Sequence, residues 1–322
     1  MKKNIEIFCT LGPSSINKSF LKFAKNKISL LRLNMSHTNI ETLKENIIFI
    51  KKNSNIPICI DTEGAQIRIK TKIAKFFKIN QKFKIFKKNN SINLYPHDVY
   101  DKLNIRDILN IGFDDLKANV ISKNLKFMTL KVFSAGRLEN NKGVHVENRS
   151  VKLDFLTKKD LQAIEAGKKL NIKNFALSFT NSVSDIIKFN KILPTQRKIF
   201  KLESKQAIET FHMIIKVGNN FLIDRGDLSK EILIENIPYI QRKILKTAKK
   251  FKNKNIYIAT NFLESMIENK FPTRGEANDI YNSLETGAKG LVLAAETAIG
   301  HYPKEAVTFL RKMILVYQKF TQ

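Results

Sequence analysis

Short apolar strands that alternate with amphipathic helical stretches predict an α/β protein, a (β/α)8 barrel with a small inserted β domain. Eight strand-helix units can be recognised, the number that closes such a barrel. One long interval, residues 69–151, has a different pattern and interrupts the series after the third strand. Without it, the chain is close to the roughly 250 residues typical of this barrel, so length and pattern agree.

The predicted strands are short runs rich in β-branched and aromatic residues. The stretches between most of them repeat apolar residues with a helical period. We expect strands at 5–10, 28–34, 56–62, 175–179, 198–203, 221–224, 256–260 and 290–296, and helices that include 40–53, 157–170, 237–251, 276–287 and 305–320.

The interval 69–151 consists of short alternating segments, such as 77–88 and 125–136, separated by turn signals such as YPHD and NNKG. It is far too long for a loop, and its pattern is all-β. We therefore expect a barrel domain made of residues 1–68 and 152–322, and a small inserted β domain made of residues 69–151.

Several classes of protein are excluded. No apolar run approaches the roughly 18 residues of a membrane span, and Glu6 interrupts the short apolar stretch near the start, unlike a signal peptide. Cys9 and Cys59, the two cysteines, lie in surroundings typical of buried strands, which argues against a disulfide-dependent secreted fold. We expect a soluble cytoplasmic protein with no membrane partner.

The net charge is strongly positive, +28 from 57 Lys+Arg and 29 Asp+Glu. Such an excess is typical of proteins that bind nucleic acids. Here the lysines are spread along the chain and interleaved with the apolar periodicity, and the abundance of Lys, Asn, Ile and Phe indicates a compositional bias. We favour solvated basic faces and no specific nucleic-acid partner.

Polar residues stand at the carboxyl ends of the predicted strands, where (β/α)8 barrels place their chemistry. In a strand, Lys201 and Glu203 face the same side. They either neutralise each other as a salt bridge or hold a metal ion and an anion between them. The whole set suits divalent-metal-assisted phosphoryl transfer, which requires charge neutralisation and positioning. It comprises Arg32, Asn34, Asp61, Thr62, Ser178, Lys201, Glu203, Arg225, Asp227, Thr260 and Glu296.

Nine blocks of this sequence resemble the pyruvate kinase family, in the family's order and over almost the whole chain. The resemblance implies a (β/α)8 barrel with an inserted small β-barrel lid domain. It also implies that the protein transfers phosphate from phosphoenolpyruvate to ADP in glycolysis. The blocks are CTLGPSS (9–15), RLNMSH (32–37), DTEGAQIR (61–68), NKGV (141–144), FKLES (200–204), RGDLSKEI (225–232), ATNFLESM (259–266), PTRGEANDI (272–280) and ETAIGHYPKEAV (296–307).

The resemblance also implies roles for single residues. Glu203 and Asp227 are similar to the family's ligands of Mg²⁺ or Mn²⁺, and Lys201 would stabilise the migrating phosphoryl group. The implied catalytic residues are Lys201, Thr260 and Arg32, and the implied substrate contacts are Arg32, Lys201, Gly226, Asp227 and Thr260.

Two further sites follow from the same resemblance. The implied nucleotide contacts are Arg68, Lys142, Asn34, His37 and Pro13, and the implied K⁺ pocket consists of Asn34, Ser36, Asp61 and Thr62. The pocket residues could instead cap or turn the chain. Gln66 stands where a family glutamate accompanies potassium dependence, which leaves the requirement for K⁺ undecided.

Other departures concern charge and length. Asp224 stands where the family has a small residue, and a single helix follows the last strand where pyruvate kinases continue into a C-terminal effector domain. We therefore expect a short form, a homodimer or monomer without sugar-phosphate allostery.

Two other functions are weighed against this one. A catalytically lapsed barrel that acts as a basic RNA-binding or scaffold protein would not retain the charges of Lys201, Glu203 and Asp227. A different enzyme of phosphoenolpyruvate, such as an aldolase or mutase, would not need the nucleotide contacts Arg68 and Lys142.

Overall fold

The computed structural model describes residues 4–320 except residues 65, 89–90, 113–115, 148 and 150. By its internal contacts the chain divides into two units. The first combines residues 1–64 with 158–322, and the second consists of residues 65–157. The predicted insert, 69–151, lies within the second unit.

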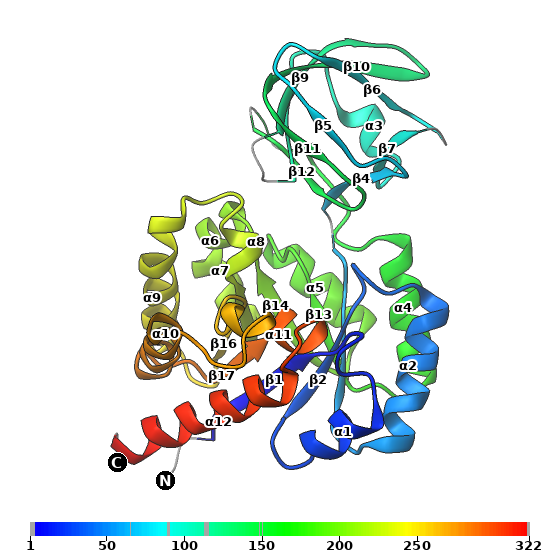
Figure 1. The fold of residues 1–322 in the computed structure, drawn as a ribbon. Coiled ribbons are helices and arrows are strands. Elements are labelled where there is room, and N and C mark those ends of the chain that lie inside the picture. Colours follow the sequence, from blue (N-terminus) through cyan, green and yellow to red (C-terminus); the bar gives the residue numbers. More distant parts are fainter. Residues whose placement is uncertain are drawn as a thin grey trace. The chain divides into compact units, whose positions relative to one another are not determined.

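The first unit contains the predicted barrel (Figure 1). Within the described residues, eight parallel strands pair in the order β1-β17-β16-β15-β14-β13-β3-β2, and the last strand closes on the first. All eight predicted strands are confirmed, with ends that differ by a few residues. They are β1 (Glu6–Thr10), β2 (Leu30–Asn34), β3 (Ile58–Asp61), β13 (Asn174–Leu177), β14 (Arg197–Leu202), β15 (Asn220–Asp224), β16 (Asn255–Ala259) and β17 (Gly290–Leu293).

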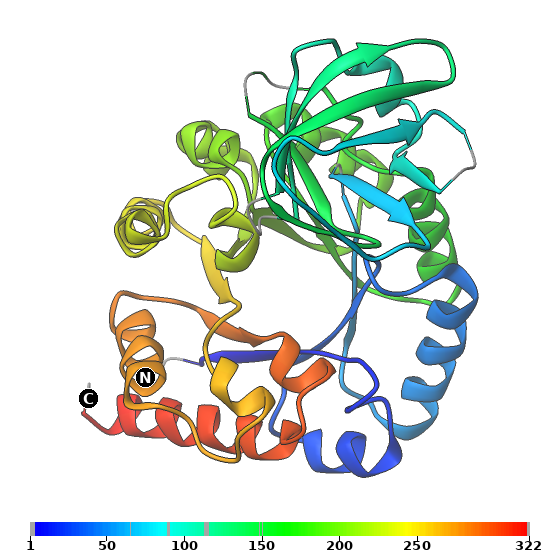
Figure 2. The same cartoon turned by 45° about the horizontal axis from the view of Figure 1, so that its top comes forward.

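Helices surround these strands on the outside (Figure 2), and α12 packs against α10 and α1. Many begin at a side-chain cap; for example, Oδ1 of Asn39 accepts a hydrogen bond from the backbone N–H of Thr42 at 2.7 Å. The five predicted long helices are confirmed as α2, α4, α9, α10 and α12. The bounds are α1 (Lys18–Ala24), α2 (Ile40–Asn53), α4 (Lys158–Lys169), α5 (Val183–Ile192), α6 (Lys205–Glu209), α7 (Phe211–Val217), α8 (Arg225–Leu228), α9 (Ile237–Ala248), α10 (Arg274–Glu285), α11 (Ala295–Ala298) and α12 (Pro303–Phe320), with 3-10 helices at Ile234–Asn236 and Glu264–Ile267.

A layer of apolar side chains fills the middle of the barrel, and every strand contributes to it. Because side chains alternate across a strand, the positions two residues before and after this layer also face inward. The layer therefore fixes which residues line the two ends of the barrel. Its members are Phe8, Leu30, Cys59, Ala176, Ile199, Leu222, Tyr257, Ala259 and Val292.

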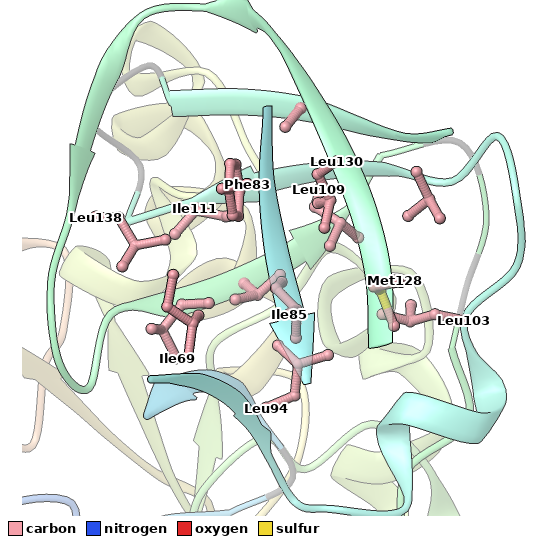
Figure 3. Close-up of a cluster of buried hydrophobic side chains, with 14 of the residues drawn as sticks. Ile69, Phe83, Ile85, Leu94, Leu103, Leu109, Ile111, Met128, Leu130 and Leu138 are labelled. Carbon is pink, nitrogen blue, oxygen red and sulfur yellow. The ribbon is translucent and has the colours of Figure 1, made fainter. Parts of the chain in front are cut away.

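The second unit is a small β-barrel, which confirms the all-β pattern of the insert. Its described residues form a closed sheet in the order β10-β6-β7-β4-β12-β8-β9 and a two-stranded sheet of β11 and β5. Alternating residues of the strands, such as Ile85, Met128 and Leu130, point into one apolar core (Figure 3). The elements are β4 (Ile67–Thr71), β5 (Lys75–Phe77), β6 (Lys82–Phe86), β7 (Ile92–Tyr95), α3 (Val99–Lys102), β8 (Ile108–Ile111), β9 (Leu116–Lys123), β10 (Phe127–Ser134), β11 (Gly136–Leu138) and β12 (Gly143–Val146).

Both cysteines are buried in strands, as predicted: Cys9 in β1 and Cys59 in β3. Burial raises the pKa of the Cys59 thiol to about 12, so the thiol stays protonated and packs as a small apolar group. Among the described residues, no helix combines the length and the apolar character that a membrane crossing requires.

Candidate active site

A charged layer lies at the carboxyl end of the barrel, directly beyond the apolar layer. Each of its members follows an apolar inward-facing residue by two positions, as Lys201 follows Ile199 and Asp224 follows Leu222. The strand period therefore turns these side chains toward the barrel axis, and all of them are buried. The charged members are Arg32 on β2, Asp61 on β3, Lys201 on β14 and Asp224 on β15.

Lys201 occupies the centre of this layer. Its Nζ lies 2.6 Å from Oε1 of Glu203, 3.4 Å from Oδ2 of Asp61 and 3.5 Å from Oδ2 of Asp224. It also donates a hydrogen bond to Oγ of Ser178 at 3.2 Å. Burial lowers the pKa of Lys201, but the three carboxylates outweigh burial and the net pKa is raised. Lys201 therefore remains an ammonium ion and is not engaged in a simple two-residue salt bridge.

Arg32 provides a second buried cation. Its Nη2 pairs with Oδ2 of Asp61, while its Nε and Nη1 are buried without a hydrogen-bond partner among the described residues. Burial lowers the pKa of Arg32, but the charge of Asp61 outweighs it and the net pKa is raised. Because buried N–H groups are normally paired, two unpaired nitrogens on a charged guanidinium indicate a place for an anion.

Glu203 follows the last residue of β14 and is almost completely buried. Its Oε2 accepts a hydrogen bond from the backbone N–H of Phe179 at 2.7 Å, whereas Oε1 lies 2.6 Å from Nζ of Lys201 and has no hydrogen-bond donor of regular geometry among the described residues. Burial raises the pKa of Glu203 and Lys201 opposes this effect, while the carboxylates of Asp227 and Asp224 add to it. Negative charge is therefore in excess around this oxygen, which favours a bound cation.

Three carboxylates come together at this point. One oxygen each from Glu203, Asp224 and Asp227 lie within 4.8 Å of one another, and this is the acidic group able to hold a metal ion among the described residues. Glu203 and Asp227 were predicted, whereas Asp224 was seen as a departure in sequence and not as a member of the site.

The prediction that Arg225 and Asp227 end a strand is wrong. β15 stops at Asp224, which is the N-cap residue of the short helix α8, and Asp227 is three residues further along. Residues three apart on a helix lie on the same face, so Asp227 folds back beside Asp224. The D-x-x-D pattern of Asp224 and Asp227, at the junction of a strand and a helix, was the feature of the sequence that could have indicated that the two carboxylates lie side by side.

Thr260 follows β16 with a left-handed backbone, at a φ of 70°. Its Oγ1 accepts a hydrogen bond from the backbone N–H of Gly226 at 2.8 Å, donates to the carbonyl of Ala259 at 2.6 Å and lies 3.3 Å from Oδ1 of Asp224. Arg225 donates to the carbonyl of Thr260 at 3.1 and 2.5 Å. These contacts fix the half-buried Thr260 hydroxyl beside the charged layer.

Comparison with known proteins shows the family to which the chain belongs. The family model described as pyruvate kinase, barrel domain, matches residues 2–307. The chain belongs to the pyruvate kinase family. It is 30% identical to the pyruvate kinase of Thermotoga maritima over 97% of this chain and 70% of the relative. It is 30% identical to the pyruvate kinase of Staphylococcus epidermidis and 29% identical to that of Staphylococcus aureus, over 97% of this chain and 56% of each relative.

The chain thus spans little more than half the length of the staphylococcal pyruvate kinases and 70% of the Thermotoga one. The matched part includes the whole eight-stranded barrel, with every strand that contributes to the charged layer. Family membership therefore agrees with the fold of the barrel.

The predicted K⁺ pocket lies at the ends of β2 and β3. Asn34 and Asp61 end these strands and are register partners, and Ser36 and Thr62 follow them. Oδ1 of Asn34 accepts a hydrogen bond from the backbone N–H of Ser36 at 2.9 Å. Oγ1 of Thr62 accepts one from the backbone N–H of Ser178 at 3.0 Å. These bonds fit the alternative in which the residues turn the chain, and the potassium pocket stays a prediction.

The predicted nucleotide contacts are divided between the units. Asn34 ends β2, and Pro13 and His37 are exposed in the loops that follow β1 and β2. Arg68 falls within the residues 1–68 that were expected in the barrel domain, but β3 stops at Asp61 and Arg68 lies in β4 of the second unit.

Within the second unit, Arg68 and Lys142 are close in space, because Arg68 pairs with Gly143 on the adjacent strand β12. Nη1 of Arg68 donates to the carbonyl of Asn141 at 3.2 Å, and Nζ of Lys142 donates to the carbonyl of Arg137 at 3.0 Å. Their role toward a nucleotide stays a prediction.

Glu296 does not join the carboxylates of the site. It lies in α11, and its carboxylate accepts hydrogen bonds from the backbone N–H groups of Leu263 at 3.1 Å and Ala294 at 2.7 Å. The expectation that it ends the eighth strand is wrong, because β17 already stops at Leu293. Its buried carboxylate holds the loop after β16 in place.

Proposed function

We propose that this chain transfers the phosphoryl group of phosphoenolpyruvate to ADP and produces pyruvate and ATP. The bond between phosphorus and the enol oxygen breaks, a bond to a β-phosphate oxygen of ADP forms, and the enolate carbon takes up a proton. The observation that carries the proposal is the buried ammonium of Lys201 among the carboxylates of Asp61, Glu203 and Asp224. Membership of the pyruvate kinase family supports the same reaction.

Arg32 and Lys201 are the proposed phosphoryl contacts. The two unpaired nitrogens of Arg32 form part of a planar fork that matches phosphate oxygens. Lys201 stays charged in a buried layer, where an ammonium stabilises the developing charge of the transition state more strongly than in water. We propose that Arg32 holds the phosphoryl group and that Lys201 follows it during transfer.

The carboxylates of the site fit Mg²⁺ or Mn²⁺, which prefer oxygen ligands and accept a few carboxylates together with water and substrate oxygens. Oε1 of Glu203, a buried oxygen whose close neighbour is the ammonium of Lys201 at 2.6 Å, has a further lone pair for an ion. We propose Glu203 and Asp227 as the residues that hold the ion. When bound, it neutralises charge on the phosphoryl oxygens.

Gly226 and Thr260 are the proposed contacts at the enol end of the substrate. The N–H of Gly226 donates to Oγ1 of Thr260, and a substrate carboxylate would take this donor in place of Thr260. The proton of the Thr260 hydroxyl is donated to the carbonyl of Ala259, and we propose that the hydroxyl turns from this carbonyl to help deliver a proton to the enolate carbon, directly or through water. The fixed left-handed backbone of Thr260 keeps the hydroxyl at this place.

For the nucleotide we propose Arg68 and Lys142 of the second unit and Asn34, His37 and Pro13 of the first. K⁺ would lie among Asn34, Ser36, Asp61 and Thr62. The requirement for K⁺ depends on Gln66, whose Oε1 is buried without a hydrogen-bond partner in the part of the chain that the structure describes. Rates measured in K⁺ and in tetramethylammonium would decide whether this neutral side chain leaves the enzyme dependent on K⁺.

A coupled assay tests the proposed function. Pyruvate formed from phosphoenolpyruvate and ADP is followed with Mg²⁺ present and with the ion removed by a chelator. We expect turnover with Mg²⁺, and its loss on chelation. The alternative is a catalytically lapsed barrel that binds RNA. It would be supported if no pyruvate formed under any of these conditions and the protein shifted labelled RNA in a gel.

A further inference from the structure

The charged layer and the neighbouring Glu203 together contain more buried carboxylates than buried cations. Among the described residues there, Asp61, Glu203 and Asp224 are each at most 5% exposed, and they face Arg32 and Lys201, which are equally buried. The outer carboxylate of Asp227 already has a partner, because Nζ of Lys230 lies 2.5 Å away. A buried charge without a counter-charge is costly, so the layer as it stands attracts one more cation.

Asp224 is the carboxylate with the weakest contacts in this layer. Its Oδ2 lies 3.5 Å from Nζ of Lys201, whereas Glu203 lies 2.6 Å from the same atom. Its Oδ1 lies 3.3 Å from the hydroxyl of Thr260, longer than the usual O–H···O range of about 2.5–3.0 Å. Neither contact explains why a carboxylate should be buried here, since a buried charge is normally held by short hydrogen bonds.

The position of Asp224 does suit a cation. One of its oxygens lies within 4.8 Å of an oxygen of Glu203 and of Asp227. Opposite ligands of one Mg²⁺ are about 4.2 Å apart, so a small adjustment of the side chains brings all three carboxylates onto one ion. Oε1 of Glu203 is buried beside Nζ of Lys201, 2.6 Å away, and has no hydrogen-bond donor of regular geometry among the described residues, so this oxygen can also contact a metal ion.

We propose that Asp224 is a third carboxylate ligand of the divalent cation, beside Glu203 and Asp227. The inference rests on the proposed function for the location of the metal. The affinity of an oxygen site rises with the number of charged ligands. Three carboxylates therefore hold the ion more tightly than the two that remain when a small residue, as the pyruvate kinase resemblance implies, stands at position 224.

Binding of Mn²⁺ without phosphoenolpyruvate and without ADP tests the proposal, with free Mn²⁺ measured by electron paramagnetic resonance. We compare the unchanged chain with Asp224→Asn and Asp224→Ala. The control, Glu209→Gln on α6, removes one negative charge from an exposed side chain. We expect both Asp224 variants to raise the Kd for Mn²⁺ by about tenfold or more, because one charged ligand is lost, and the control to leave it unchanged.

A Kd for Mn²⁺ that stays within twofold in both Asp224 variants would overturn the proposal and leave Asp224 as a positioning residue for Lys201 and Thr260. Asp224→Asn has nearly the same shape as the original side chain, so it provides the test if Asp224→Ala fails to fold, as judged by circular dichroism and thermal unfolding.

Two further variants separate this inference from the proposed function. If Glu203→Gln and Asp227→Asn weaken Mn²⁺ binding while Asp224→Asn does not, the proposed metal site stands and the inference fails. If the unchanged chain shows no saturable Mn²⁺ binding without substrate, the inference also fails, whereas the pyruvate assay still decides the proposed function. Weaker binding in all three variants supports three carboxylate ligands.

Discussion

Nζ of Lys201 lies 2.6 Å from Oε1 of Glu203, and both side chains are buried at the carboxyl end of the barrel. An isolated pair of this kind would be a structural salt bridge. Here the same ammonium also lies near Asp61 and Asp224, and the same carboxylate lies near Asp227. Lys201 belongs to the buried cations, with Arg32, and Glu203 belongs to the acidic group, with Asp224 and Asp227. The two groups meet at this contact, a geometry that can hold a phosphoryl group and a metal ion side by side.

Lys201→Met should reduce turnover in the pyruvate assay by several orders of magnitude. The variant keeps the length of the side chain but removes a charge that stabilises the transition state in a buried site. Binding of Mn²⁺ should be retained or strengthened, because a competing positive charge disappears. Steady-state kinetics and Mn²⁺ titration are the two measurements.

The matched control is Lys205→Met, which removes an exposed lysine four residues away on α6 and should leave turnover unchanged. Equal rates for Lys201→Met and the unchanged chain would refute a catalytic role for Lys201. Loss of Mn²⁺ binding together with turnover would show instead that Lys201 holds the carboxylates in place.

Asp61→Asn should destabilise the fold by about 2–3 kcal/mol near neutral pH, because Arg32 loses its charged partner inside the barrel. Burial raises the pKa of Asp61, but Lys201 and then Arg32 outweigh it, and the net pKa is lowered. The stabilising contribution is therefore complete above the unfolded-state pKa of about 3.9 and is lost as the pH falls through the lower folded-state value.

Urea unfolding of the two proteins between pH 7 and pH 3 measures this dependence. The difference in free energy of unfolding should stay constant down to about pH 4 and then shrink. Exposed Asp154→Asn serves as the control and should show no such difference. A difference that grew toward acid pH would contradict the lowered pKa of Asp61.

Much of the site follows from the two-residue period of the strands. Once Ile199 is taken as an inward-facing core residue, Lys201 must face inward as well, and the same rule places Asp61 two residues after Cys59. The strand positions could therefore be read from the pattern of apolar residues, and the resemblance to the pyruvate kinase family gave them roles.

The residues beyond the strand ends could not be read in the same way. The period changes from two to 3.6 where α8 begins, and this change brings Asp227 beside Asp224. Glu296 lies in α11 for a similar reason, with its carboxylate turned to backbone N–H groups. A pattern of apolar residues carries no information on a helix of four residues, so the third carboxylate emerged only from the structure.

Tyr257→Phe should lower the free energy of unfolding by about 1–2 kcal/mol without changing turnover. Tyr257 belongs to the apolar layer of the barrel, and its hydroxyl donates to Oε1 of Glu6 at 2.8 Å and accepts from Nη2 of Arg197 at 2.5 Å. Glu6 and Arg197 precede the apolar layer on β1 and β14, at the end of the barrel opposite to Lys201. Their own ion pair, at 3.0 Å, remains in the variant and limits the loss.

Urea unfolding and the pyruvate assay together test this separation of stability from activity. Tyr239→Phe on α9 changes an exposed tyrosine in the same way and should alter neither quantity. A fall in turnover for Tyr257→Phe, at a temperature where the variant is fully folded, would show that the two ends of the barrel are coupled.

Glu276→Gln should destabilise the start of α10 and the loop before it. The carboxylate of Glu276 accepts hydrogen bonds from the backbone N–H groups of Thr273 and Ser265, both at 2.7 Å, and from the hydroxyl of Ser265 at 2.5 Å. Thr273 in turn caps the backbone N–H of Glu276, which completes a capping box. An amide in place of the carboxylate turns an NH₂ group toward one set of donors, so we expect a loss of about 1–2 kcal/mol.

The pH dependence of stability distinguishes the charge of Glu276 from its shape. Burial raises the pKa of Glu276, but the hydrogen bonds from Ser265 and Thr273 outweigh burial and the net pKa is lowered. Its contribution to stability is therefore complete above the unfolded-state pKa of about 4.3 and is lost at lower pH, where the free energies of unfolding of the unchanged chain and Glu276→Gln should converge.

Thr273→Ala removes the helix cap, which should lower the free energy of unfolding by about 1 kcal/mol, and provides the second arm of a double-mutant cycle. Because Thr273 and Glu276 bond to each other, the two losses should be less than additive, and strict additivity in urea unfolding would mean that the capping box does not act as a unit.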